Sequence, residues 1–131
     1  MYEVEIIRFQ PVHIKQEFSL SNAVEATKMA LELDDETSFI AIADIRDNAC
    51  WGEFLVWRSE GRALVRLNEH RQHFASYQDA SAIQTGNATF LDDDGSAFHT
   101  PLAHTVSIES AKEALVHWLS TGNATTALIW S

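Results

Sequence analysis

Apolar and polar residues alternate in several segments of the chain, and the period of the alternation predicts strands. Between Tyr2 and Phe9, Val4 and Ile6 fall on one side while Glu3 and Glu5 fall on the other. This period of two is typical of a half-buried strand. Further strands are expected where apolar or alternating segments are bounded by turn residues, at 39–45, 51–57, 62–67, 88–91, 97–100 and 126–130.

Two other segments have the period of an amphipathic helix. The first covers about 21–33, where Asn22 can cap the helix and Glu25 stands at the capping-box position. The second covers about 108–121, with Ser107 as its N-cap and Gly122 at its C-terminal stop. We expect the apolar face of the first helix to consist of Leu20, Ala23, Val24, Thr27, Ala30 and Leu31.

Turn residues separate these elements and set the fold class. Gly61 suits a left-handed turn position between two strands, and Asp94-Gly95 is a strong hairpin signal. The segment 68–86 has no assignable pattern. The order of elements predicts an α+β fold in a single domain over 1–131, with a mostly antiparallel sheet of about six to seven strands and two packed helices.

The composition supports one folded domain with a core. The chain has 131 residues, of which 46% are hydrophobic, and no segment reaches the ~18 apolar residues of a membrane span. The first residues lack the basic start and apolar run of a secretory signal. The single cysteine, Cys50, excludes an internal disulfide, fits a reducing compartment and is interpreted as a small core residue. We therefore expect a cytoplasmic protein.

The charge balance restricts the partners. Nineteen acidic residues against nine basic ones give a net charge of −10. Nucleic acids and anionic membranes would be repelled, whereas a basic protein would be attracted. We predict a protein partner with a basic surface, no nucleic acid and no membrane; a solubility role for the charge is the alternative.

Motifs for catalysis or for metal and cofactor binding are missing. The six histidines do not form a recognisable zinc pattern, and Asp92-Asp93-Asp94-Gly95 fails as a calcium loop because Phe90 and Pro101 occupy ligand positions. There is no nucleophile elbow and no glycine-rich phosphate loop. We predict a protein that is not an enzyme, with neither metal nor cofactor.

Acidic and aromatic residues are the candidates for a binding surface. Acidic residues at the C-terminal end of the first helix oppose the helix dipole, and acidic residues in the second hairpin turn exceed what the turn needs. Two tryptophans and one glutamate on a predicted strand would share one face as an anchor patch, unless a helix covers that face. These candidates are Asp34, Asp35, Glu36, Asp92, Asp93, Asp94, Trp51, Glu53 and Trp57.

The last quarter of the chain resembles a known family. From about Phe90 onward a strand, an acidic turn, a strand and a helix ending in Trp118-Leu119-Ser120-Thr121-Gly122 are followed by Trp130, eight residues after Gly122. This pattern resembles the type 1 immunity protein family of bacterial polymorphic toxin systems. Trp118 stands where that family usually has Phe, and Asn123 stands where it usually has Pro.

The resemblance implies an antitoxin that binds and occludes a secreted toxin, often a deaminase-like or nuclease domain with a basic groove. The family's motif residues then act in the core and do not identify the interface. Two alternatives stay open. One is a small ligand-binding or catalytic α+β domain that pairs His70 or His73 with a carboxylate, and the other is a generic interaction adaptor.

Overall fold

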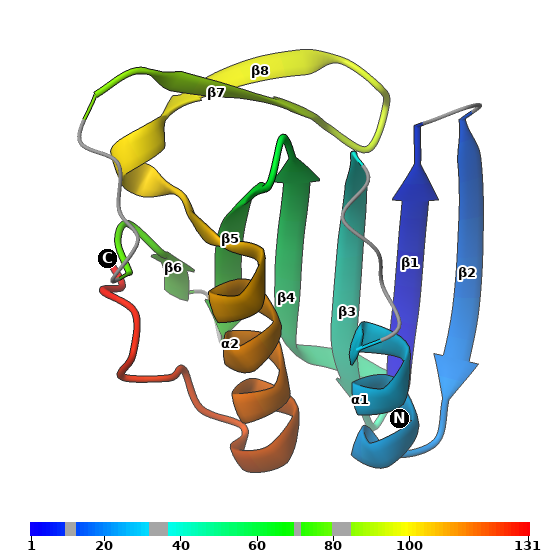
Figure 1. Ribbon diagram of the computed structural model, residues 1–131. Coiled ribbons are helices and arrows are strands. Elements are labelled where there is room, and N and C mark those ends of the chain that lie inside the picture. Colours follow the sequence, from blue (N-terminus) through cyan, green and yellow to red (C-terminus); the bar gives the residue numbers. More distant parts are fainter. Residues whose placement is uncertain (10–12, 32–36, 70–71, 80–84) are drawn as a thin grey trace.

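A seven-stranded antiparallel sheet forms the centre of the molecule (Figure 1). The computed structural model describes residues 1–9, 13–31, 37–69, 72–79 and 85–131. Six strands follow the order β2-β1-β3-β4-β5-β6, and β9 pairs with β5. Their bounds are β1 Tyr2–Arg8, β2 Ile14–Leu20, β3 Ser38–Arg46, β4 Ala49–Ser59, β5 Arg62–Glu69, β6 Gln72–Ala75 and β9 Val106–Ser107.

The remaining elements are a hairpin and helices. β7 (Asn87–Leu91) and β8 (Ala97–Pro101) form a separate two-stranded sheet, followed by the short 3-10 helix η1 (Leu102–His104). The two α-helices are α1 (Ala23–Leu31) and α2 (Ile108–Thr121). The predicted α+β class, antiparallel sheet and two helices are confirmed. No helix in the described ranges has the length and hydropathy to cross a bilayer.

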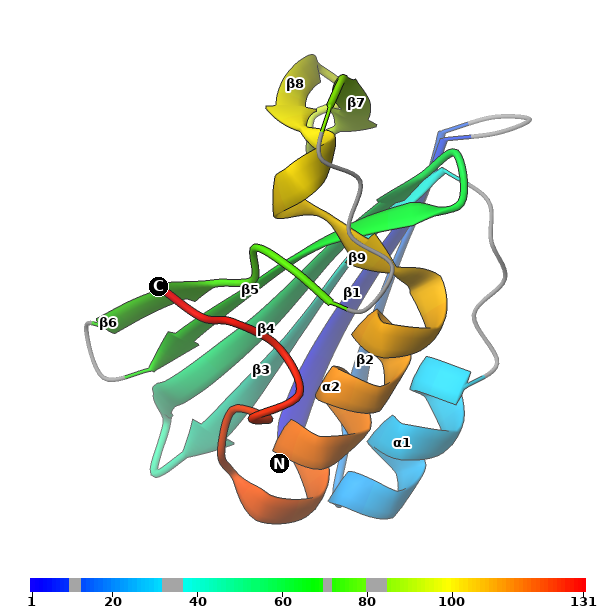
Figure 2. The same cartoon turned by 60° about the vertical axis from the view of Figure 1, so that its left-hand side comes forward.

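Both helices pack on one face of the sheet, and the main core lies between the helices and the sheet (Figure 2). Alternate residues of the strands point into it because side chains in a strand alternate between faces. Trp118 of α2 is only 4% exposed, and its ring centroid lies 5.7 Å from that of Phe54 and 6.4 Å from that of Tyr2. The strands supply Val4, Ile6, Ile40, Ile42, Phe54, Val56, Val65 and Leu67.

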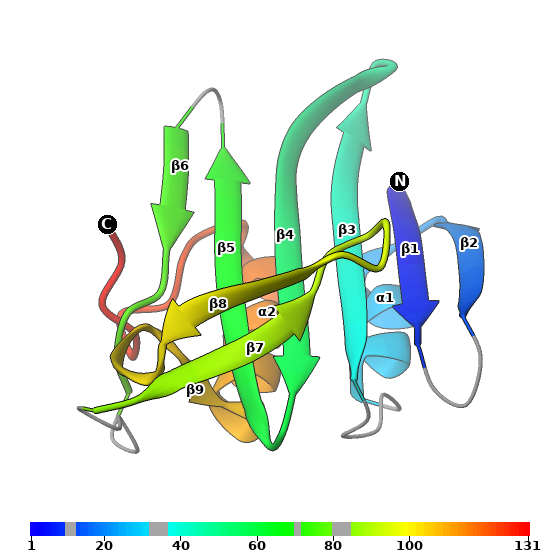
Figure 3. The same cartoon turned by 90° about the horizontal axis from the view of Figure 1, so that it is seen from above.

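The β7–β8 hairpin covers part of the opposite face of the sheet (Figure 3). Ile7, Phe39 and Phe90 are buried outside the main core. The Trp57 ring lies 5.3 Å from Phe39 and 6.0 Å from Phe98, centroid to centroid. This second apolar cluster fixes the hairpin at one end of the strands and leaves the other end of that face open.

The predicted caps and turns are present. The Glu25 amide donates to Asn22 Oδ1 over 3.0 Å, and the Ser21 amide donates to the Glu25 carboxylate over 3.3 Å. Gly122 ends α2 with a left-handed φ of 76°, after Ser107 has capped its start. Glu60 and Gly61 both have positive φ, as a two-residue turn between twisted antiparallel strands requires.

The prediction missed β2 and assigned part of it to the first helix. Leu20 is the last residue of β2, and Val24 is 69% exposed on α1, so neither assignment to the buried helix face is correct. The residues of β2 are exposed on both faces except for Leu20. A strand without a buried face has no apolar alternation, and this one is instead defined by its pairing with β1.

The predicted terminal strand at 126–130 is wrong. Trp130 forms an isolated bridge with Ser76, while 126–129 is turn and irregular chain. Backbone bonds to the residues after β6 are limited to the last residues, where Ala75 and Ser131 exchange amide-to-carbonyl bonds and the Tyr77 amide donates to the Ile129 carbonyl, each over 3.0 Å. Before them the bonds are local: the Ala127 amide donates to Thr125 Oγ1 over 3.2 Å, and Trp130 Nε1 donates to the Thr125 carbonyl over 2.7 Å. Thr side chains often compete with regular structure in this way.

A largely buried polar cluster joins β5 to the start of α2. Arg62 donates to the Thr105 hydroxyl over 3.0 Å and to the Thr105 carbonyl over 2.8 Å. Asp79 accepts the Ser107 amide over 2.7 Å, and its carboxylate lies 4.0 Å from the Arg62 guanidinium. The cluster therefore satisfies a backbone donor at the N-terminus of α2, where a negative charge is also favourable.

Asp79→Ala is expected to lower the free energy of unfolding by about 2–4 kcal/mol, because it leaves the Ser107 amide and the Arg62 guanidinium with fewer partners. Urea unfolding followed by circular dichroism measures the change. The exposed Asp93→Ala variant is the control, with an expected change within about 0.5 kcal/mol. Equal effects of the two substitutions would show that the cluster adds nothing to stability.

Candidate functional site

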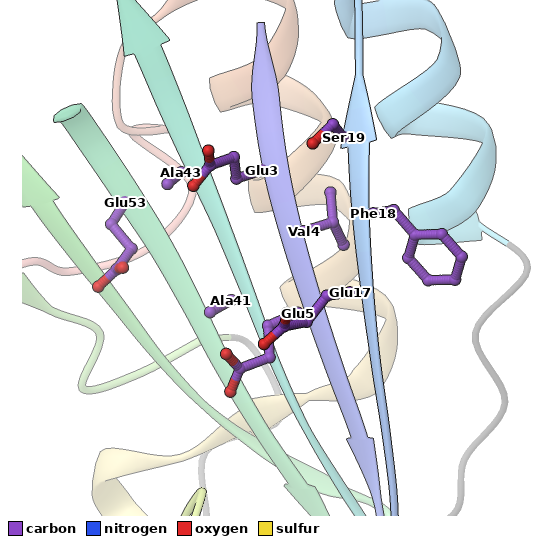
Figure 4. Close-up of a pocket in the computed structure, with 9 residues that line it drawn as sticks. All are labelled: Glu3, Val4, Glu5, Glu17, Phe18, Ser19, Ala41, Ala43 and Glu53. Carbon is purple, nitrogen blue, oxygen red and sulfur yellow. The ribbon is translucent and has the colours of Figure 1, made fainter. Parts of the chain in front are cut away.

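A shallow acidic hollow lies on the open half of the sheet, on the face opposite the helices (Figure 4). Its volume is about 380 Å³. Glu3 and Glu5 of β1 and Glu17 of β2 stand on one side of it, and Glu53 of β4 stands on the other. We call this surface the acidic hollow; its lining residues are Glu3, Val4, Glu5, Glu17, Phe18, Ser19, Ala41, Ala43 and Glu53.

The register of the sheet explains why the hollow forms. Glu3 lies opposite Ala43, and Ala43 lies opposite Glu53 on the next strand. In the adjacent row, Glu17 lies opposite Glu5, and Glu5 lies opposite Ala41. Directly opposite residues point to the same face, so the short alanine side chains make a floor between longer glutamates. The carboxylates consequently border an indented surface.

Lys15 is the cation that contacts the border of the hollow. Its Nζ lies 3.2 Å from a Glu17 oxygen and 3.7 Å from a Glu5 oxygen. The hydrogen bond to Glu17 and the charges of both carboxylates raise the pKa of Lys15. Glu3 and Glu53 form no such ion pair among the described residues. The negative charge of these two carboxylates is therefore not balanced by a neighbouring cation in the described part of the chain, and the hollow presents a negative surface.

A chain of polar side chains extends from Glu53 toward the far edge of the sheet. Asn68 Nδ2 lies 3.5 Å from a Glu53 oxygen, and Asn68 Oδ1 lies 2.8 Å from His73 Nδ1. Among the described residues, His73 thus connects to the Glu53 carboxylate through the Asn68 amide and makes no direct pair with it. His70 lies outside the described residues.

A β-bulge separates Trp51 from Glu53 and Trp57, the two residues that were expected to share its strand face. The register of β3 with β4 shifts between Asp44 and Ile45, so Trp51 is the extra residue of a bulge in β4. Trp51 lines a different hollow beside Tyr2 and Trp118, on the helix side of the sheet, while Glu53 lines the acidic hollow. Trp51 therefore does not share the face of Glu53 and Trp57 as predicted, and of the three residues Glu53 lines the acidic hollow.

Trp57 lies under the hairpin and does not form an exposed anchor. Its Nε1 donates to Asp92 Oδ1 over 3.3 Å, and the same oxygen accepts the Asp93 amide over 3.0 Å. Asp92 is partly buried and connects the turn to β4, whereas Asp93 is exposed. These two contacts give Asp92 a structural role in the hairpin.

Asp94 also serves the turn. Its Oδ1 accepts the Ser96 amide over 2.9 Å and the Ser96 hydroxyl. These hydrogen bonds lower the pKa of the Asp94 carboxyl. The remaining acidic candidates, Asp34, Asp35 and Glu36, lie outside the described residues.

Ser96→Ala is expected to raise the pKa of Asp94 toward its ordinary value, because the hydroxyl donor is lost while the backbone donor stays. Since the folded pKa is depressed, this interaction favours the folded state above the unfolded pKa and is lost as the pH falls through the folded pKa. A carboxyl NMR titration measures the shift. An unchanged Asp94 pKa in the variant would contradict the assigned cause.

The residues of the closing helix line the second hollow, of about 510 Å³, at the C-terminal end of α2. Trp118 points into the core and packs against Gly52. A Cβ atom at position 52 would lie 3.4 Å from the Trp118 ring. Cys50, at the start of β4, is exposed, so its interpretation as a core residue is wrong. The bulge that follows it carries this end of β4 out of the core.

No protein-family model matches the chain, and the comparison with curated proteins finds no match. The resemblance to immunity proteins therefore rests on the residues of the closing helix and Trp130. In the described part of the chain, no group of three or more His, Cys, Asp or Glu side chains is arranged to hold a metal ion.

The sequence contained a signal for the acidic hollow that was not used. Glu3 and Glu5 were placed on the polar side of the first strand, but their neighbours on the sheet were unknown. Glu17 belongs to the missed strand β2, so its position beside Glu5 could not be predicted. The hollow depends on pairing between strands that are distant in sequence.

Proposed function

We propose that the protein is an immunity protein that binds a cognate toxin in the cytoplasm and covers the toxin's active site. The toxin would act on nucleic acid, as a deaminase-like domain or a nuclease, and would carry a basic groove for its substrate. The immunity protein acts by occlusion and needs no catalytic residue of its own.

The acidic hollow is the observation that carries this proposal. Glu3 and Glu53 stand on its two sides above a floor of Ala41 and Ala43, so a lysine or arginine side chain can enter between them. An arginine in a phosphate-binding groove would find the same kind of charge partner that its substrate offers. The net charge of −10 adds long-range attraction to such a groove.

The helix motif supports the family and not the binding surface. Trp118 and Leu119 are buried in the main core, and Gly122 ends α2. These roles agree with the core function that the resemblance implies for the motif. The acidic hollow is on the opposite face of the sheet and is free to differ between proteins with different toxins.

Co-expression with the toxin domain encoded beside this protein tests the proposal. We expect an affinity-tagged, catalytically inactive toxin domain to capture the untagged protein. The two proteins should then elute together from size-exclusion chromatography in equal molar amounts. A matched toxin domain with its basic groove residues changed to glutamate is the control and should retain little. Separate elution of the unmodified pair at micromolar concentration would contradict the proposed function.

A further inference from the structure

Strand β2 is an open edge of the main sheet (Figures 1 and 3). The edge at β6 is partly closed, because the Ala75 and Ser131 amides each donate to the other residue's carbonyl over 3.0 Å. Within the described ranges, no segment pairs with the outer side of β2. Edge strands of this kind offer backbone donors and acceptors to a further strand.

The hydrogen-bond pattern shows which backbone groups of β2 point outward. The Ile45 amide donates to the Met1 carbonyl over 2.8 Å, so odd-numbered residues at β1 bond toward β3. Because bonding alternates along an antiparallel strand, even-numbered residues of β1 bond toward β2. Their partners in β2 are also even-numbered. The outward groups therefore belong to Lys15, Glu17 and Ser19.

The side chains of β2 add an apolar surface to this edge. Ile14 is 46% exposed and Phe18 is 37% exposed, although large apolar residues are usually covered. Both lie on the side of the sheet that carries the helices, two residues to either side of Gln16. Although Phe18 is among the residues that line the acidic hollow, Figure 4 shows its ring pointing away from the hollow.

We infer that β2 pairs with β2 of a second copy of this chain, antiparallel and centred on Gln16. In this register Lys15 of each copy lies opposite Glu17 of the other, and Ile14 lies opposite Phe18. The Lys15 and Glu17 backbone groups point outward, so the two symmetric pairs can form backbone hydrogen bonds as well. Charge, apolar contact and backbone bonding are thus satisfied by a single register.

Neighbouring registers lack this complementarity. The two sheets form one continuous sheet only if the two-fold axis is perpendicular to it, so that residues facing the same side lie opposite each other. The axis must then pass beside a residue of β2, and the alternative registers are centred on other residues of that strand. Centring on Lys15 places two lysines opposite each other, and centring on Glu17 places two glutamates opposite each other. Like charges directly opposite are unfavourable, whereas opposite charges stabilise a strand pair.

The charges on an edge strand can also serve to prevent pairing between copies. Within the chain Lys15 contacts Glu17 and Glu5, at 3.2 and 3.7 Å. In the Gln16-centred register each Lys15 also lies opposite a Glu17 of the second copy. The charges of β2 therefore favour this pairing and do not prevent it. The dimer would place two acidic hollows on one continuous face of a joined sheet.

Sedimentation equilibrium in 0.15 M NaCl tests the inference. We expect a concentration-dependent species of twice the 14.7 kDa chain mass. Lys15→Glu and Glu17→Lys should each weaken the dimer by about tenfold or more, and the double exchange should restore it to within about threefold. Arg66→Glu, on an exposed residue of β5, is the control because it changes the net charge as Lys15→Glu does.

A monomer at all concentrations up to several hundred micromolar would overturn the inference, as would a Lys15→Glu effect no larger than that of Arg66→Glu. Failure of the double exchange to restore the dimer would also overturn this register. Circular dichroism of each variant establishes that it is folded.

A cysteine cross-link gives a second test that needs no charge change. Gln16 faces its own copy at a pair without backbone bonds, where side chains approach most closely. In a Cys50→Ser background, Gln16→Cys should form a disulfide-linked dimer on mild oxidation, and Ser19→Cys should not. Cross-linking through Ser19→Cys, or none through Gln16→Cys, would overturn the inference. Neither test involves a toxin, so the outcome is separate from that of the proposed function.

Discussion

The double variant Glu3→Lys, Glu53→Lys is expected to bind the toxin roughly 100-fold more weakly or worse. At each position a charge that attracts the basic surface of the toxin is replaced by one that repels it. The two residues stand on opposite sides of the Ala43 floor, so both face a basic side chain that enters the acidic hollow. Surface plasmon resonance with an inactive toxin domain measures the change. We expect a slower association that depends less on salt, together with a faster dissociation.

The control for this variant is Glu60→Lys with Glu113→Lys, at two exposed positions outside the hollow. Each Glu→Lys change removes one negative charge and adds one positive charge, so both double variants change the net charge from −10 to −6. Their long-range effects on association should be similar, and only the variant in the hollow should lose short-range contacts. Equal affinities of the two double variants would place the binding surface elsewhere.

Trp118→Ala is expected to cost about 3–5 kcal/mol of unfolding free energy, because a large buried ring is replaced by a cavity. The Trp118 side chain is 4% exposed, packs on Phe54 and Tyr2, and closes the gap above Gly52. Urea unfolding monitored by circular dichroism gives the change. The loss is comparable to the whole stability of many domains, so low soluble expression is part of the expected result.

Trp51→Ala is the matched control because it removes the same side chain from the opposite kind of environment. Trp51 is 41% exposed and stacks against the Arg46 guanidinium, 5.4 Å from its ring centroid. We expect a loss of about 1 kcal/mol or less. A similar loss in both variants would contradict the central role of Trp118 in the core.

The elements with local signals were predicted correctly, and those defined by distant pairing were not. α2 has a capping serine, an apolar stripe and a terminal glycine, all within one segment. β3, β4 and β5 carry apolar cores bounded by turn residues. β2 lacks a buried face, and its strand conformation depends on β1. The segment after α2 has strand-forming residues, but only its last residues bond to 75–77, and the residues before them make local side-chain bonds.

The candidate binding surface was predicted less well for a related reason. Asp92 seemed in sequence to exceed what the Asp94-Gly95 turn needs, yet its carboxylate accepts hydrogen bonds from Trp57 Nε1 and from the Asp93 amide. The shared face of Trp51 and Trp57 assumed an uninterrupted alternation, which the bulge in β4 breaks. Glu53 was a candidate in the sequence and lines the acidic hollow, but its neighbours Glu3 and Glu5 come from β1.

Protection of a cell by contact through the acidic hollow is the central claim of the proposed function. Growth of cells that express the active toxin domain encoded beside this protein measures this directly. At equal soluble levels, the unmodified protein and the Glu60→Lys, Glu113→Lys control should restore growth, and the Glu3→Lys, Glu53→Lys variant should not. Full protection by the Glu3→Lys, Glu53→Lys variant, or no protection by the unmodified protein, would contradict it.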